Sequence, residues 1–289
     1  VHPARRGPEG AGGMSLAEPI EVDPERVTAA RAGQEGAFGA LVRPLLPRLE
    51  AFALRMLAHP DDAAEAVQDA LLKAHQGLAG FRGEARFETW LLSILTRVCI
   101  DALRARQRWR WDAQAHARTD PQAPHHAVLE QLRAPDAGFE AREHIAFCLC
   151  CVSRSLPPEE AAAVLLREVF GLRNKEAARA CGVSESVLRH RLSAGRTAMK
   201  DAFEGLCGLV SKAGVCYQCE GLRDRTPAER QGEALPDLSG DREASLRRRL
   251  AIVRDADLEH GRAAALHRLM FRAVADTEAR ARRPRSTPD

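Results

Sequence analysis

The chain has 289 residues, a formal net charge of +3 and only 4% aromatic residues, with a single Tyr. This composition disfavours β-sheets, and its abundant Ala, Leu, Arg and Glu favour helices. No apolar run reaches the roughly 20 residues that a membrane span needs, so we expect an all-α cytoplasmic protein without a membrane partner.

The N-terminal residues lack any periodic pattern. Residues 1–13 are rich in Gly, Pro and Arg, and we predict a disordered leader and the start of a first helix over residues 1–35. From Ala37 to Phe52 the apolar residues recur at helical spacing, although Pro44 and Pro47 are expected to kink or break this helix.

A second helix is predicted to begin at Asp61 and Asp62, because carboxylates favour the positive end of a helix. One face is apolar. The opposite face is polar and acidic, and it carries Glu65, Gln68, Asp69 and Lys73. Such a face suits a basic partner surface, but an ordinary solvated helix has the same pattern.

The loop over residues 81–86 combines an aromatic residue, Gly and Arg before a third helix. Aromatic faces stack on bases and Arg binds phosphate, so the loop is a plausible surface for a base that leaves its stack. The polar residues Arg82, Glu84 and Arg86 are the candidates. For Phe87 and Trp90, a place in the core is the favoured interpretation.

The third helix ends in a basic run that includes Arg104, Arg106 and two Trp residues. This run is suited to phosphate contacts, and a solvated helix end explains it equally well. Residues 112–137 contain Pro, His, Gln and Asp with little periodicity, which predicts a flexible linker between a domain over 36–111 and another over 138–204.

Residues 174–203 have the outline of a helix-turn-helix, with Cys181-Gly182-Val183 as the turn and Ser184 as the cap of the second helix. In such a motif the start of the second helix reaches base edges, while later cations contact phosphates. We therefore expect Lys175 and Arg196 near the DNA backbone. The base-contact candidates are Ser184, Glu185, Ser186, Arg189, His190 and Arg191.

Cysteines lie on both sides of this helix-turn-helix. Cys148 and Cys151 share a helix face at i, i+3 spacing, and Cys216 and Cys219 form a second pair. Cys207 lies between the two pairs and is expected to be an auxiliary ligand. Two such pairs can bind zinc or another thiophilic metal. Scattered structural cysteines are the alternative. Residues 205–289 are expected to form a C-terminal extension that ends in one long helix.

The residues at 61–69 and 81–91 closely resemble region two of the extracytoplasmic-function (ECF) sigma factors. Ser155-Leu156-Pro157-Pro158 and the helix-turn-helix at 174–199 resemble region four of the same family. The resemblance implies two small helical domains joined by a linker, no catalytic activity, no required cofactor and no small-molecule substrate.

The same resemblance implies core RNA polymerase and promoter DNA as partners. Glu65, Gln68 and Asp69 would then dock on the polymerase, the loop at 81–86 would open the minus-ten element, and the helix-turn-helix would read the minus-thirty-five element. Metal-responsive members with flanking cysteines lack a separate anti-sigma factor, and whether this chain has one stays open.

Two other functions fit parts of the chain. A helix-turn-helix regulator that never binds core polymerase explains residues 174–203 but not the pattern at 61–91. A thiol or metal enzyme needs a nucleophile with a positioned base or an open metal position, and the sequence contains no Ser/His/Asp, phosphate-loop or HExxH pattern.

Overall fold

The computed structural model describes residues 15–105, 141–206, 238, 240–258, 260–261 and 264–282. All regular elements within these ranges are helices, which confirms the predicted all-α class. No helix in this part of the chain is long and apolar enough to cross a membrane.

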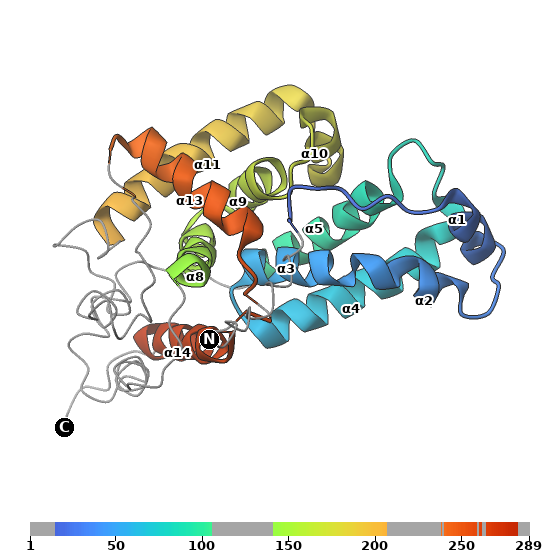
Figure 1. The fold of residues 1–289 in the computed structure, drawn as a ribbon, viewed down its shortest axis with the longest axis horizontal. Coiled ribbons are helices and arrows are strands. Elements are labelled where there is room, and N and C mark those ends of the chain that lie inside the picture. The colour runs from blue at the N-terminus through green and yellow to red at the C-terminus, as the bar shows by residue number, and fades with distance from the viewer. Residues whose placement is uncertain are drawn as a thin grey trace, which may run out of the picture.

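The N-terminal half is a bundle in which α3, α4 and α5 pack on one another (Figure 1). As expected, the helix pattern that begins at Ala37 is interrupted where Pro44 and Pro47 fall, and a short 3-10 turn separates two helices there. The elements are α1 (Pro24–Arg31), α2 (Ala37–Val42), η1 (Arg43–Leu45), α3 (Leu46–Leu57), α4 (Pro60–Gly77), η2 (Leu78–Gly80) and α5 (Phe87–Ala105).

Helix α1 falls within residues 1–35, where the sequence predicted a leader and the start of a first helix. Its N-terminus follows ordinary capping rules, because the Asp23 carboxylate accepts a hydrogen bond from the Glu25 N–H and Pro24 occupies the first turn. Asp23-Pro24-Glu25 was therefore the available sequence signal for this helix.

The second half contains α8 (Ala141–Ser155), α9 (Pro158–Val164), the π-helical turn η3 (Leu165–Val169), α10 (Asn174–Cys181) and α11 (Glu185–Leu206). Helices α10 and α11 form the predicted helix-turn-helix. Gly182 ends α10 with φ of 65°, a left-handed conformation that favours glycine. The Ser184 hydroxyl then accepts a hydrogen bond from the Val187 N–H at 3.4 Å.

In the described part of the C-terminal extension, α13 (Arg242–Asp255) and α14 (Ala264–Arg282) are separate helices, so the prediction of one continuous helix was wrong. The chain turns extended at Ala256, and the Asp257 carboxylate accepts a hydrogen bond from the His260 N–H at 2.8 Å. A Cβ at position 261 would collide with the Asp257 carbonyl and the Glu143 carboxylate, so Gly261 permits this tight connection. Apolar spacing alone cannot reveal such a break.

Helix α13 lies across α8, α11 and η3, between the helix-turn-helix and α3 (Figure 1). The two halves also contact each other directly, because α3 packs on α8 and α5 packs on α9 and α10. Phe52 of α3 and Phe170 meet edge to face at 5.3 Å, and both are buried. The hydrophobic core therefore runs continuously from one half into the other.

Candidate functional site

Helix α4 presents one exposed polar face. The apolar residues Ala63, Val67 and Ala70 face the core, whereas Glu65, Gln68 and Asp69 are exposed as predicted. Within the described residues, these three side chains make no ion pair or hydrogen bond, and all three are exposed to solvent.

Sequence reasoning missed Leu72, which is 58% exposed and lies on this same face. Positions 65, 68, 69 and 72 follow the spacing of one helix stripe. An exposed Leu among carboxylates is typical of a binding surface, where an apolar anchor is surrounded by polar groups. The signal in the sequence was an apolar residue outside the core-facing positions.

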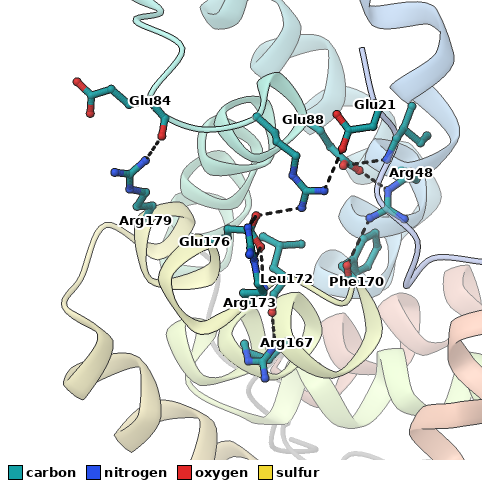
Figure 2. Close-up of polar contacts among 12 residues, drawn as sticks. Glu21, Arg48, Glu84, Glu88, Arg167, Phe170, Leu172, Arg173, Glu176 and Arg179 are labelled. Carbon is teal, nitrogen blue, oxygen red and sulfur yellow. Dashed lines mark hydrogen bonds and ion pairs between the residues drawn. The ribbon is translucent and has the colours of Figure 1, made fainter. Parts of the chain in front are cut away.

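The loop at 81–86 borders a pocket of about 380 Å³. Arg82 and Glu84 are exposed, as expected for contact residues. The pocket wall is partly aromatic and partly polar, because Phe81, Trp90 and Ser93 all contribute to it. Arg179, from α10 in the other half of the protein, also borders the pocket and donates a hydrogen bond to the Glu84 carbonyl at 2.5 Å (Figure 2).

Three aromatic residues form a cluster that anchors this loop to α5. Phe81, Phe87 and Trp90 have ring centroids 5.1 to 5.6 Å apart. Phe87 is buried, which confirms its place in the core, whereas Trp90 is half-buried and borders the pocket. The cluster holds the loop in place, and Trp90 remains partly accessible at the pocket.

The start of α11 is exposed. Leu188 is fully buried and fixes the rotation of the helix, so the opposite side faces solvent. Val187 is 42% exposed, which contradicts the expectation that it faces the core. Five of the predicted base-contact residues are exposed: Ser184, Glu185, Ser186, Arg189 and His190. The sixth, Arg191, is half-buried.

Several predicted DNA-contacting cations are ion-paired with carboxylates of another part of the fold. Arg86 pairs with Glu176 of α10 at 3.1 Å. Arg104 pairs with Glu159 of α9 at 2.5 Å. Arg106 lies outside the described residues, and Lys175 is exposed on α10. These pairs join the two halves of the protein.

Arg196 is held by two carboxylates, Glu168 at 2.6 Å and Glu243 of α13. Glu243 also pairs with Lys200 at 3.2 Å. The hydrogen bonds from Lys200 and Arg196 lower the pKa of Glu243 below its ordinary value. Glu243 therefore stays ionised, and α13 covers a cation that was expected to contact DNA.

Two of these interdomain carboxylates have lowered pKa values. Burial alone would raise the pKa of Glu176, but hydrogen bonds from Arg173 and the charge of Arg86 lower it overall. Burial likewise opposes ionisation of Glu159, and its own backbone N–H together with Arg104 lowers the pKa. Both carboxylates are charged at neutral pH.

A buried ion pair that sequence reasoning missed lies at the junction of the two halves. Arg48 and Glu88 are 1% and 3% exposed, and their side chains meet at 2.5 Å (Figure 2). Burial lowers the pKa of Arg48 and raises that of Glu88, because desolvation disfavours both charges. Arg48 also donates to the carbonyl of Phe170 at 3.4 Å.

The same Arg48 binds an N-terminal strap, which we define as residues 15–20. It donates to the carbonyls of Leu16 and Glu18, each at 2.6 Å. The Ile20 N–H donates to the Glu88 carboxylate at 3.1 Å. The strap is thus held between the two halves through its main chain.

Arg55, seven residues after Arg48 on α3, is completely buried. It donates to the carbonyl of Ala256 at 2.9 Å, just beyond the end of α13. Carbonyls at a helix end lack partners within the helix, and a cation there also interacts favourably with the helix dipole. The signal in the sequence was two Arg residues within an otherwise apolar stripe.

The cysteine prediction lies partly outside the described residues. Cys148 is half-buried and Cys151 is 7% exposed on α8, whereas Cys207, Cys216 and Cys219 lie outside the described ranges. Among the described residues, no group of three or more His, Cys, Asp or Glu could hold a metal ion. Burial raises the pKa of Cys181 to about 11, so this thiol stays protonated at neutral pH.

Comparisons with known proteins identify the family. The family model for Sigma-70 region 2 matches residues 41–109, and that for Sigma-70, region 4 matches residues 148–199. The ECF RNA polymerase sigma factor SigM of Mycobacterium tuberculosis (strain ATCC 25618 / H37Rv) is 33% identical over 174 residues, which cover 60% of this chain and 81% of that protein. The chain belongs to the ECF sigma factors of the sigma-70 family, which recognise promoters and initiate transcription.

Other matches cover a similar share of the chain. The ECF RNA polymerase sigma-E factor of Escherichia coli (strain K12) is 25% identical, with 60% of this chain and 90% of that protein covered. The solved structure of CnrH in complex with the cytosolic domain of CnrY is 21% identical and has a TM-score of 0.43, with 62% and 96% of the two chains covered.

Proposed function

We propose that this chain docks on core RNA polymerase through the exposed face of α4 and directs the enzyme to promoters. The observation that carries this proposal is the stripe of Glu65, Gln68, Asp69 and Leu72, which no other described part of the fold covers. A carboxylate surface with one apolar anchor suits a basic partner. The chain would act without catalysis of its own or a small-molecule substrate, in the cytoplasm, where its partners lie.

Promoter DNA would be read at two places. The pocket at the loop over 81–86 has an aromatic wall at Trp90, on which a flipped base would stack. The exposed start of α11 would enter the major groove at the minus-thirty-five element. The corresponding domains are those proposed from the sequence, 36–111 and 138–204, with a linker at 112–137.

The α4 surface can be tested by Glu65→Lys/Gln68→Ala/Asp69→Lys in the full chain. We expect core polymerase affinity to fall at least about tenfold, which corresponds to about 1.4 kcal/mol. Leu72→Ala should weaken binding as well, because it removes the apolar anchor. Both effects are measured by titrating labelled protein with core polymerase.

The matched control is Glu25→Lys/Glu35→Lys, which makes the same change in net charge at exposed positions outside α4. Helicity by circular dichroism should be unchanged in all variants. Tight core binding by the α4 triple variant would show that docking uses another surface. Failure of the parent to bind core polymerase would favour the alternative, a helix-turn-helix regulator that acts alone.

We also propose the metal site formed by Cys148, Cys151, Cys216 and Cys219, with Cys207 as an auxiliary ligand. The support is that Cys148 and Cys151 occupy one helix of the second half at i, i+3 spacing. Thiolates bind zinc-like ions strongly, because binding displaces their protons. Such a site would join the C-terminal extension to region four and regulate promoter binding.

Anaerobically purified protein should contain about one thiophilic metal ion per chain, and Cys148→Ser/Cys216→Ser should lose it. Elemental analysis with thiol titration measures both. Cys181→Ser is the control, because its protonated thiol is a poor ligand and the variant should keep the metal. A metal-free parent protein with unchanged activity in the double variant would contradict the site.

A further inference from the structure

The described arrangement brings the two promoter-reading surfaces together. Arg179 of the helix-turn-helix touches the Glu84 carbonyl of the region-two loop. Glu185, the first residue of α11, follows six residues later and lies at most about 22 Å further along the chain, even when fully extended. The two surfaces are therefore within about 30 Å of each other once the length of the Arg179 side chain is added.

Promoter geometry demands a larger separation. The minus-ten and minus-thirty-five elements are named for positions 25 base pairs apart, which corresponds to about 85 Å along B-form DNA. The arrangement in Figures 1 and 2 therefore cannot contact both elements at once. If the proposed function holds, the two halves must separate before promoter binding.

Contacts from outside both promoter-reading halves hold this closed arrangement. At the C-terminal end of α13, the carbonyl of Ala256, the residue that follows the helix, accepts a hydrogen bond from Arg55 of α3, and Arg254 donates to the Glu168 carbonyl at 2.5 Å. At its other end, Glu243 binds Arg196 and Lys200 of α11. The C-terminal end of α13 thus contacts both regions, through Arg55 of region two and Glu168 of region four, and its N-terminal end contacts region four.

The strap completes this junction. The Leu16 N–H donates to the Arg254 carbonyl at 2.9 Å, and Arg48 holds the strap from the region-two side. Gly171, two residues after η3, has φ of 66°, and a Cβ there would collide with the backbone of Ala17. The strap therefore packs directly on region four, on region two and on α13.

We propose that α13 and the strap form an internal clamp that holds regions two and four in a closed state unable to engage a promoter. This inference rests on the proposed function and adds its regulation. Release of α13 removes Glu243, one of the two carboxylates that hold Arg196, and removes one tie between the halves. The C-terminal extension is therefore the segment of this same chain that restrains it.

The test exchanges two neighbouring charges in the first turn of α13. Arg242 pairs with Glu204 at 3.2 Å and with Asp201, while Glu243 pairs with Arg196 and Lys200. Arg242→Glu/Glu243→Arg makes all four pairs repulsive and preserves the net charge of the protein. Any gain in DNA affinity then cannot come from added positive charge.

The matched control is Glu25→Arg/Arg26→Glu, which exchanges two neighbouring exposed charges in the first turn of α1. Small-angle X-ray scattering at about 0.1 M salt measures compactness, since screening is moderate at that concentration. Affinity without polymerase is measured on duplex DNA carrying a promoter identified by in vitro transcription. Circular dichroism checks that each variant is folded.

We expect the α13 exchange to expand the protein and to bind this DNA at least about fivefold more tightly, while the α1 exchange matches the parent. An α13 variant that stays compact, or that expands without tighter DNA binding, overturns the clamp. If neither the parent nor the α13 variant supports transcription with core polymerase, the proposed function is overturned, and random-sequence duplex replaces the promoter in the affinity measurement. Expansion of the α13 variant with tighter binding to that duplex then still supports the clamp.

Discussion

Replacement of Glu88 by Leu is expected to lower the free energy of unfolding by about 3–5 kcal/mol, because it leaves the Arg48 guanidinium buried without its counter-ion. Arg48 is only 1% exposed and cannot regain water without movement of the strap or α3. Urea unfolding monitored by circular dichroism measures the change. An exposed site offers the matched control, Glu50→Leu, for which a change within about 0.5 kcal/mol is expected.

The double variant Arg48→Met/Glu88→Leu should recover part of the loss, since removal of both charges also removes their desolvation cost. Recovery is incomplete because the carbonyls of Leu16, Glu18 and Phe170 lose their donor. A Glu88→Leu protein as stable as the parent would mean that the Arg48 charge is solvated or paired elsewhere.

Arg189→Ala is expected to reduce the preference for its cognate base by about 1–3 kcal/mol, if this exposed residue makes a two-hydrogen-bond contact with a base edge. Lys175→Ala should instead weaken binding to all sequences alike and reduce the salt slope by about one. The measurement is a salt series of affinities on single-base variants of the minus-thirty-five element.

Lys175 is the better phosphate probe than Arg196, since Arg196 also binds Glu243 and its removal would loosen α13. The reverse pattern, with relaxed specificity in the Lys175 variant and a uniform loss in the Arg189 variant, would exchange the two roles. Equal behaviour of both variants and the parent would show that α11 does not read this element.

The fold class and most helices were predictable because local signals determine them. Pro44 and Pro47 interrupt a helix, and Gly182 supplies the left-handed residue of the helix-turn-helix. These effects depend on residues close in the sequence. The exposed face of α4 followed in the same way, because its core-facing residues recur at helical spacing.

Contacts between distant segments were not predictable. Arg48 and Arg55 belong to an apolar stripe, where a cation is ordinarily expected to point outward. Their burial is explained by the Glu88 carboxylate and by carbonyls of the strap and of the residues that follow η3 and α13. The break between α13 and α14 likewise depends on Gly261 meeting Glu143 of another helix. The ion pairs that join the two halves, such as Arg86 with Glu176, were also not predictable, because their partners lie far apart in the sequence.

The hydrogen bonds that hold the strap leave some freedom for its sequence to diverge. Within the strap, Arg48 and Glu88 bind main-chain atoms of residues 16, 18 and 20 and no side chain. Every amino acid provides the carbonyls, and every residue except proline provides the N–H. Evolution can therefore alter the exposed side chain at 18 while keeping the path of the strap, provided that the two charged partners persist and proline stays out of position 20.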